Sequence, residues 1–520
     1  MEKIWEDLRK NRKQFCLCLA AVFIWGLFAH GFAFCNNNVN HDSLREFHGE
    51  ILGNEIKMGS GRVFTPIYRE LIGTDLTLPW LGGLLALLWI GIAVFFIVRV
   101  FRVDSPVLIG LIAGVCTTNI AVSSTAATYI HDLDCYMFSM LCAVSAVYLW
   151  RSHRFGWIVG GIFGALSLGI YQSFVFVAVV MVMMVCILDL LEEKSFRAVF
   201  GEGIRAIGMF AIGGAMYFVM MKVLLALAGL QLVGGEYNSL DRVTALTAQN
   251  ILPQMLSAYR ECLKRLVDSY SSYPGILVKG GTLLLLLLAA VALVTGLLNR
   301  KVGYAEKALC LLLTVLLPLA MNMIHVLTVG KNHDLMTYPI WFSYILALLL
   351  ADRIWKKKQA TPAGRLLQGQ RLLCMVLVFV LAYGNVRFAN GMYMKKELEH
   401  EAYQSLMTRV VARMELREDY VPGETEVVFV KLPDNMTEVM PGFKDYWNVT
   451  GMTKSDMIYV GARDRFQAYF DYMLSLPILL AEEDVWNAAP QLEAVQQMPV
   501  YPAGDSMQMI DGILYVKLGS

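Results

Sequence analysis

The chain has 520 residues, of which 57% are hydrophobic and only 17% are charged, whereas roughly a quarter of the residues in a typical soluble protein are charged. This composition excludes a soluble multidomain protein and predicts a polytopic α-helical membrane protein. The formal net charge of +1 falls far short of the large, clustered basic surface that nucleic acid binding requires, so we expect no nucleic-acid partner.

Apolar runs that can cross about 30 Å of hydrocarbon as helices recur along the first three quarters of the chain. They lie near residues 15–35, 79–100, 104–122, 133–150, 155–171, 173–191, 206–229, 276–298, 307–329, 337–352 and 371–390. The polar stretches SSTAATYIHDLD and YQS fit either turns outside the membrane or broken helices inside it. We therefore predict about eleven transmembrane helices.

Lys and Arg residues flank every second connection between these runs. They precede the first run and recur near residues 99–102, 151–154, 194–205, 300–307 and 353–371. Because cytoplasmic loops are enriched in Lys and Arg, we predict a cytoplasmic N-terminus. The predicted outer loops are then residues 36–78, 123–132, 230–275 and 330–336, and the chain after residue 390 is also extracytoplasmic.

Two of the predicted outer loops contain patterns typical of helices that lie on a membrane surface. In the first loop, Ser43 and Glu46 form an S-x-x-E capping box, and apolar residues follow at helical spacing. In the third loop, an apolar stripe runs through residues 251–270, with Lys264 and Arg265 beside it. These two basic residues would reach the level of the lipid headgroups.

The composition changes after residue 390, where charged residues become more frequent. A helical pattern is followed by the strand-like stretch EVVFVKL at residues 426–432 and by a strand pair around MQMIDGILYVKL. We predict a transmembrane domain over residues 1–390 and a small extracytoplasmic α/β domain over residues 391–520. About 130 residues are enough to form a core of their own.

Three His-Asp dipeptides fall in the predicted outer loops, although they are far apart in the sequence. They are His41-Asp42, His131-Asp132 and His333-Asp334. Asp42 immediately precedes the serine of the capping box, so it can stabilise a helix N-terminus, act in catalysis, or do both. His131, Asp132 and Asp134 open a predicted span, where they can cap the helix or bind a substrate.

A divalent metal held by these dipeptides is chemically allowed, because imidazole and carboxylate groups suit several divalent ions. However, no closely spaced motif such as H-x-x-x-H accompanies them. We therefore expect no cofactor, with a divalent metal as the alternative.

Basic residues in the predicted outer loops are notable because few are expected on that side. Arg62 and Arg69 lie in GRVFTPIYRE, and Lys331 lies in the last outer loop. Each is a candidate to bind a phosphate at the depth of the lipid headgroups, and contact with a headgroup is the alternative.

The motifs NHDSL, GRVFTPIYRELIG, PWLGG, ATYIHDLDCYMFSMLCAVSAVYLW and GIYQS occur in this order. Together they resemble the bacterial membrane glucosyltransferase-II family. This family includes serotype-converting O-antigen glucosyltransferases and belongs to the GT-C superfamily. The resemblance is strongest over residues 15–190 and extends more weakly to about residue 390. It implies a GT-C-like fold in a bacterial cell membrane.

The resemblance also implies a reaction, in which a sugar, with glucose expected, moves from a polyprenyl-phosphate carrier to a cell-surface glycan outside the membrane. GT-C enzymes place a catalytic carboxylate in the first outer loop, and Asp42 matches that position. Two groups could suffice for this reaction, namely a base that deprotonates the acceptor hydroxyl and a cation that stabilises the departing phosphate. Direct attack of this kind would invert the configuration at the anomeric carbon. On this hypothesis Arg62, Arg69 or Lys331 binds the phosphate. The residues expected to shape the sugar pocket are His131, Asp132, Asp134, Tyr171 and Gln172.

Three other functions stay open at this point. A flippase or transporter of lipid-linked glycans would favour buried charges along several spans, whereas the predicted spans are nearly free of acidic residues. An O-antigen polymerase or ligase would also act on the outer face. A scaffold whose C-terminal domain binds an envelope partner is the last alternative.

Overall fold

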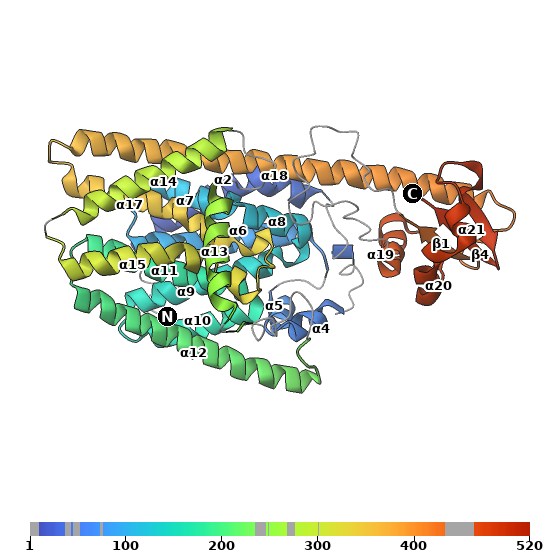
Figure 1. The fold of residues 1–520 in the computed structure, drawn as a ribbon, viewed down its shortest axis with the longest axis horizontal. Coiled ribbons are helices and arrows are strands. Elements are labelled where there is room, and N and C mark those ends of the chain that lie inside the picture. Colours follow the sequence, from blue (N-terminus) through green and yellow to red (C-terminus); the bar gives the residue numbers. More distant parts are fainter. Residues whose placement is uncertain are drawn as a thin grey trace.

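The computed structural model describes residues 10–36, 43–44, 52–72, 76–233, 246–247, 249–267, 276–299, 301–431 and 462–519. A bundle of helices is joined by one long helix to a small α/β domain (Figure 1). The bundle helices run approximately along the long axis of the molecule.

The long helices of the bundle are α2 (Arg12–Cys35), α6 (Pro79–Phe101), α7 (Pro106–Thr118), α9 (Leu133–Ser152), α10 (Gly156–Ile170), α11 (Val175–Leu191), α12 (Phe196–Ala228), α14 (Ile276–Leu297), α15 (Tyr304–Met321), α17 (Phe342–Lys358) and α18 (Gly364–Glu415). The other helical elements in this part of the chain are α4 (Leu52–Gly59), α5 (Thr65–Leu71), α8 (Ile120–Thr128), η2 (Ile130–Asp132), η3 (Gln172–Phe174), α13 (Ile251–Val267), α16 (Met323–Leu327), η5 (Asp334–Met336) and η6 (Tyr338–Trp341).

Nine helical segments among the described residues are long and apolar enough to cross a membrane. Each of the predicted runs is helical over most of its length. However, α10 has only 15 residues, and the last turn of α17 carries three lysines. The fold therefore supports a multi-pass membrane protein, and the number eleven stays a prediction.

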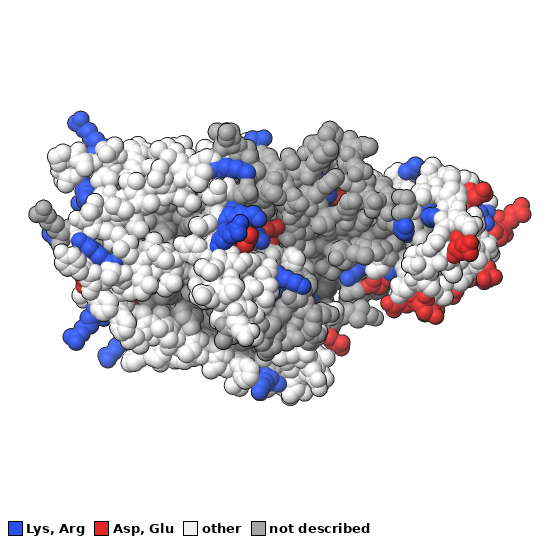
Figure 2. All heavy atoms as spheres, in the orientation of Figure 1, with Lys and Arg blue, Asp and Glu red and all other residues white. Residues whose placement is uncertain are grey.

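The surface of the bundle carries charged side chains at two levels along its long axis. One level is the left end in Figure 2, the other lies near α13, and few charged side chains occur between them. Large apolar side chains are exposed on the bundle helices, among them Ile207, Leu287 and Phe379. This apolar belt has the character expected of a surface in contact with lipid.

Helix α13 crosses the ends of its neighbours instead of running parallel to them (Figure 1). Its buried residues are Ala258, Cys262 and Leu266, and Ala258 packs with Leu319 and Val326. The predicted helix over this stretch is confirmed, and its orientation fits a helix that lies on a membrane surface.

The connections rich in Lys and Arg lie together at one end of the bundle. The turn after α11 contacts the turn after α14 through a hydrogen bond from Asn299 Nδ2 to Glu193 Oε1 of 3.0 Å, and the backbone N–H of Phe196 donates to Glu306 of α15 at 2.8 Å. Helices α4, α5 and α13 and the C-terminal sheet lie toward the opposite end (Figure 1). The separation of the two sets agrees with the predicted alternation, and which end faces the cytoplasm stays a prediction.

The prediction that residues 123–132 form an outer loop is wrong. Residues Ile120–Thr128 form α8, all of them buried, and η2 follows directly. Asn119 interrupts the helix, because its side chain accepts hydrogen bonds from the backbone of Ala121 and Val122. The hydroxyl of Thr125 donates to the carbonyl of Ala121 at 2.7 Å, which lets a polar stretch remain helical inside the bundle. Of the two possibilities for this stretch, the structure shows the broken helix.

The predicted domain boundary at residue 390 falls inside α18, a single helix of 52 residues. The far end of α18 enters the core of the C-terminal domain with Tyr403, Met407 and Val410, which are all fully buried. The helix therefore belongs to both parts of the molecule.

The C-terminal domain contains a four-stranded sheet with the order β2-β1-β4-β3. The strands are β1 (Glu426–Val430), β2 (Leu479–Leu480), β3 (Met507–Ile510) and β4 (Ile513–Lys517), and the helical elements are α19 (Arg463–Ala468), η9 (Tyr469–Leu474), α20 (Glu483–Ala488), η10 (Ala489–Gln491), α21 (Glu493–Gln497) and η11 (Gly504–Ser506). Strand β1 is parallel to β2 and β4, whereas β3 and β4 form an antiparallel hairpin. Asp511 and Gly512 have φ values of +52° and +84° in its turn, as a two-residue hairpin requires. The predicted strands are confirmed.

Candidate functional site

Residues 52–72 fold back onto the bundle as two short helices, α4 and α5, joined by a tight turn. Gly61 adopts a φ of +80° in this turn, and Pro66 lies in the first turn of α5, where proline is favoured. The turn and the helices direct Lys57 and Arg69 inward, so that both side chains are buried. Residues 52–72 thus carry basic groups into the protein.

Both basic side chains meet the carboxylate of Asp132, which is fully buried. Lys57 Nζ lies 2.6 Å and Arg69 Nη2 lies 2.8 Å from Asp132 Oδ1. His131 Nε2 lies 3.5 Å from Asp132 Oδ2. A buried carboxylate is tolerated only when it is paired in this way. We call Lys57, Arg69, His131 and Asp132 the Asp132 cluster.

Asp134 is held by a separate chain of hydrogen bonds. The Tyr68 hydroxyl donates to Asp134 Oδ2 at 2.8 Å, and the indole N–H of Trp89 donates to the Tyr68 oxygen at 2.9 Å. Burial raises the pKa of Tyr68, and the neighbouring Asp134 raises it further. Tyr68 therefore stays protonated and acts as a donor at neutral pH.

Arg62 lies against two stacked tyrosines. Its Nη1 donates to the Tyr136 hydroxyl at 2.8 Å, and its guanidinium carbon lies 4.8 Å from the centre of the Tyr171 ring. The two tyrosine rings stack with their centres 4.2 Å apart. Arg62 Nε is buried and has no hydrogen-bond partner among the described residues. One N–H of this guanidinium is therefore unsatisfied among the described residues.

The GRVFTP and GIYQS motifs, which are more than a hundred residues apart, contact each other. The backbone N–H of Phe64 donates to the Gly169 carbonyl at 2.8 Å, and Gln172 Nε2 donates to the Ser60 carbonyl at 3.1 Å. A Cβ atom on Gly169 would lie 2.2 Å from the Phe64 ring. Only glycine therefore allows the turn after α4 to approach the end of α10 this closely.

Ser43 connects the beginning of the first outer loop to the Asp132 cluster. Its Oγ lies 3.2 Å from His131 Nδ1, and its carbonyl accepts a hydrogen bond of 3.2 Å from the Thr77 hydroxyl. The next residue, Leu44, is fully buried in the core of the C-terminal domain. Asp42, the predicted catalytic residue, lies outside the described residues.

The predicted site residues fall into two groups. Seven of them come together where α4 and α5 pack against the beginnings of α9 and α11, namely Arg62, Arg69, His131, Asp132, Asp134, Tyr171 and Gln172. Lys331 is exposed in the loop between α16 and η5 and is not one of the described partners of Asp132. Lys57 was missed by the sequence analysis, although it is a basic residue in a predicted outer loop and so carries the same signal as Arg62 and Arg69.

The third His-Asp dipeptide belongs to a second polar group under α13. Asp334 pairs with Arg265 at 2.6 Å, so Arg265 contacts a protein carboxylate rather than a lipid headgroup as expected. His325 is buried and lies 3.0 Å from both Ser257 Oγ and Asn332 Oδ1. These contacts attach α13 to the loop that carries Lys331.

Within the described ranges of the chain, no group of three or more His, Cys, Asp or Glu side chains is arranged to hold a metal ion. Among the described residues, the buried or partly buried charged side chains near the turn after α4 are those of Lys57, Arg62, Arg69, Asp132 and Asp134. Grouped Lys and Arg side chains in a buried setting can bind a phosphate.

Comparison with known proteins gives one match. The family model described as Glucosyl transferase GtrII matches residues 31–351, which is more than half of the chain and includes every described residue of the Asp132 cluster. No curated protein and no solved structure matches the chain significantly.

Proposed function

Because the chain belongs to the GtrII glucosyl transferase family, we propose that it moves glucose from a polyprenyl-phosphate carrier to a cell-surface glycan on the extracytoplasmic side of a bacterial membrane. Family membership supports glucosyl transfer as the activity. The observation that carries the rest of the proposal is the grouping of the Lys57, Arg62 and Arg69 side chains around the Asp132 cluster.

The position of this group favours a donor attached to a lipid. The cluster lies at the beginning of α9, beside the ends of other apolar helices of the bundle. A polyprenyl chain can lie along such helices in the hydrocarbon while its phosphate reaches the ends of the helices. Arg and Lys side chains bind phosphate strongly when both are partly removed from water.

The proposed reaction is a single displacement at the anomeric carbon. The acceptor hydroxyl oxygen forms the new bond to C1, the bond from C1 to the phosphate oxygen breaks, and its electron pair leaves with the polyprenyl phosphate. Asp42 accepts the proton of the acceptor hydroxyl. The contact between Ser43 and His131 supports this role, because it joins the residue after Asp42 to the Asp132 cluster. Direct displacement inverts the configuration at C1.

The cations in the site have separate roles in this proposal. Arg62 offers an unused buried donor, so we assign it to the phosphate together with Arg69 and Lys57. Asp132 positions the latter two by balancing part of their charge. Tyr171 orients Arg62 through its ring, and Gln172 holds the turn through Ser60. His131 and Asp134 border the space proposed for the sugar, and Lys331 is left without a role.

The test is a comparison of the cell-surface glycans of strains with and without this gene by mass spectrometry. Loss of a single hexose from the repeating unit is expected when the gene is deleted. Shortened chains of unchanged composition would instead indicate a polymerase or a ligase. Purified protein supplied with polyprenyl-phosphate glucose should then restore the hexose to glycans from the deletion strain, whereas a water-soluble nucleotide sugar should not.

A further inference from the structure

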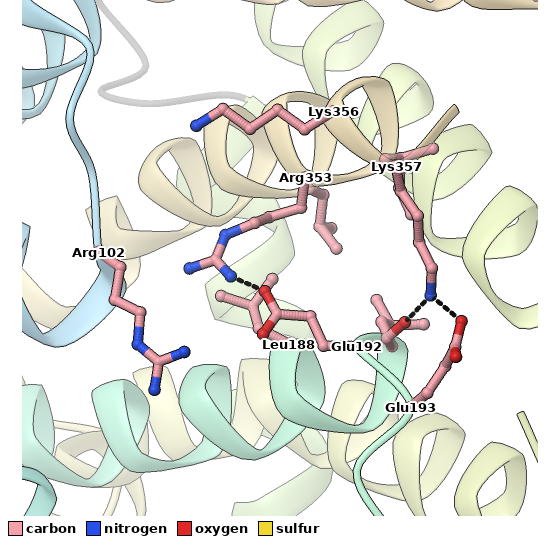
Figure 3. A pocket seen from close by; sticks show the side chains of 10 residues that line it. Arg102, Leu188, Glu192, Glu193, Arg353, Lys356 and Lys357 are labelled. Atoms are coloured by element: carbon pink, nitrogen blue, oxygen red, sulfur yellow. Dashed lines mark hydrogen bonds and ion pairs between the residues drawn. The ribbon is translucent and has the colours of Figure 1, made fainter. Parts of the chain in front are cut away.

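A pocket of about 500 Å³ lies at the end of the bundle opposite the Asp132 cluster. It is formed where α6, α11 and α17 end, in the part of the molecule that the distribution of Lys and Arg predicts to be cytoplasmic. The residues that line it are Arg102, Leu188, Leu191, Glu192, Glu193, Leu350, Arg353, Ile354, Lys356 and Lys357 (Figure 3). None of these residues takes part in the proposed glucosyl transfer.

The pocket combines apolar side chains with a charged rim. Four of its residues are leucine or isoleucine, and its charged residues are four cations and two carboxylates. An apolar lining beside a charged rim at the ends of membrane helices matches a molecule that is itself apolar at one end and anionic at the other.

Most of the rim cations already have a carboxylate partner. Arg353 pairs with Glu192 and Lys357 pairs with Glu193, as Figure 3 shows. Lys356 pairs with Asp352 at 2.9 Å, next to the pocket.

Arg102 is the exception, because its guanidinium has no hydrogen-bond or ion-pair partner among the described residues. Figure 3 shows Arg102 and Arg353 on opposite sides of an open space, with both guanidinium groups turned toward it. Because the four cations of the pocket exceed its two carboxylates, an anion between the two guanidinium groups would balance part of the remaining positive charge.

The backbone of Arg102 gives a second, independent observation. Arg102 is the residue after α6 and adopts a left-handed conformation with a φ of +53°. Glycine is the residue usually found at this position, because a side chain is strained there. The chain thus carries a large cationic side chain at a strained position, and such strain is typical of functional sites.

We propose that this pocket binds the phosphodiester headgroup of an anionic phospholipid, with Arg102 and Arg353 on the phosphate and the acyl chains beside the leucines. Basic pockets between membrane helices bind anionic headgroups in the leaflet whose surface is negatively charged. The four cations of the rim outnumber its two carboxylates, which favours an anionic headgroup. The site is separate from the Asp132 cluster and does not depend on the proposed reaction.

The experiment measures lipid binding to the full-length protein in detergent by native mass spectrometry, with phosphatidylglycerol and phosphatidylcholine as the probes. The wild type is expected to retain phosphatidylglycerol in preference to phosphatidylcholine. Arg102→Gly removes the guanidinium and suits the left-handed backbone, so the fold is preserved while the affinity falls by roughly fivefold. Arg102→Lys keeps the charge and should retain most of the binding.

Arg154→Gln is the matched control, because Arg154 is an exposed cation that packs on Phe155 outside the pocket. It should bind phosphatidylglycerol as the wild type does. Equal affinities of the wild type and Arg102→Gly, or equal retention of the two lipids by the wild type, would overturn the proposal. If inorganic phosphate alone displaces phosphatidylglycerol at millimolar concentration, the ligand is a free phosphate and the lipid assignment is wrong.

Discussion

Ser43 Oγ lies 3.2 Å from His131 Nδ1, so the residue that follows Asp42 in the chain touches the Asp132 cluster. The neighbouring Leu44 is buried in the C-terminal domain. Two consecutive residues therefore contact the Asp132 cluster and the C-terminal domain, respectively.

Asp42→Asn is expected to abolish glucosyl transfer without affecting folding. The amide cannot accept the proton of the acceptor hydroxyl, and loss of a general base reduces a rate by about a hundredfold or more. Incorporation of hexose from polyprenyl-phosphate glucose is the measurement. Glu424→Gln, which removes an exposed carboxylate of the C-terminal domain, serves as the control. Full activity of Asp42→Asn would show that Asp42 is not the catalytic base.

Arg62→Met is expected to raise the KM for the lipid-linked donor by about 10- to 100-fold, since a hydrogen bond to a charged group contributes roughly 1.5–3 kcal/mol. Arg62→Lys should restore only part of the affinity, because an ammonium group cannot stack on Tyr171 and reach Tyr136 together. The KM of each variant is measured by steady-state kinetics at varied donor concentration. Lys331→Met should leave the donor KM unchanged, and a large rise in that variant would move the phosphate site to the last outer loop.

Asp132→Asn is expected to destabilise the protein by about 3–5 kcal/mol, because it removes the buried charge that pairs with both Lys57 and Arg69. Asp134→Asn should cost far less, since an amide oxygen still accepts the hydrogen bond from Tyr68. Thermal unfolding of the purified variants in detergent compares the two. Equal losses of stability would show that Asp132 does not balance the two cations. The double variant Lys57→Met/Asp132→Asn should be more stable than Asp132→Asn alone, because it also removes one of the two cations that Asp132 pairs with.

Gly169→Ala is expected to reduce both stability and activity, because the added Cβ would lie 2.2 Å from the Phe64 ring. Overpacking of this kind costs about 1–3 kcal/mol and would move the turn that carries Arg62. Gly164→Ala on the same helix is the control, since its added Cβ would meet its nearest neighbour at 4.0 Å. Wild-type kinetics in Gly169→Ala would mean that the contact between the two motifs does not position the site.

Leu44→Ala is expected to lower kcat while leaving the donor KM unchanged. The substitution opens a cavity in the core of the C-terminal domain, at a cost of about 2–5 kcal/mol, and releases the segment next to Asp42. Leu416→Ala, at an exposed position just beyond α18, controls for loss of a leucine. An unchanged kcat in Leu44→Ala, with the C-terminal domain destabilised, would show that the domain does not position the first outer loop.

The sequence predicted the helical bundle well because hydrophobic runs of sufficient length have one stable arrangement in a membrane. It failed at residues 123–132, where serine and threonine suggested a turn. In the folded chain the hydroxyls of such residues satisfy backbone carbonyls of their own helix, as Thr125 does with Ala121. The polar composition of a segment therefore did not reveal whether it leaves the bundle.

The candidate site was predicted as a set of residues but not as an arrangement. Arg62, Arg69 and Asp132 were recognised because charges near a membrane require partners. Their pairing depends on contacts across long distances in the sequence, such as that between Phe64 and Gly169, which no periodicity encodes. Lys57 was overlooked although it carries the same signal as Arg62 and Arg69, and its burial becomes apparent only when α4 folds back onto the bundle.

The unbroken helix α18 determines the distance between the bundle and the C-terminal domain. Its 52 residues extend for about 78 Å at 1.5 Å per residue, whereas the hydrocarbon of a bilayer takes up only about 30 Å. The height of the C-terminal domain above the bundle is therefore set by the number of helical turns rather than by a hinge. Inserting a few residues into the part of α18 between the bundle and the C-terminal domain would change that height and turn the domain about the helix axis at the same time.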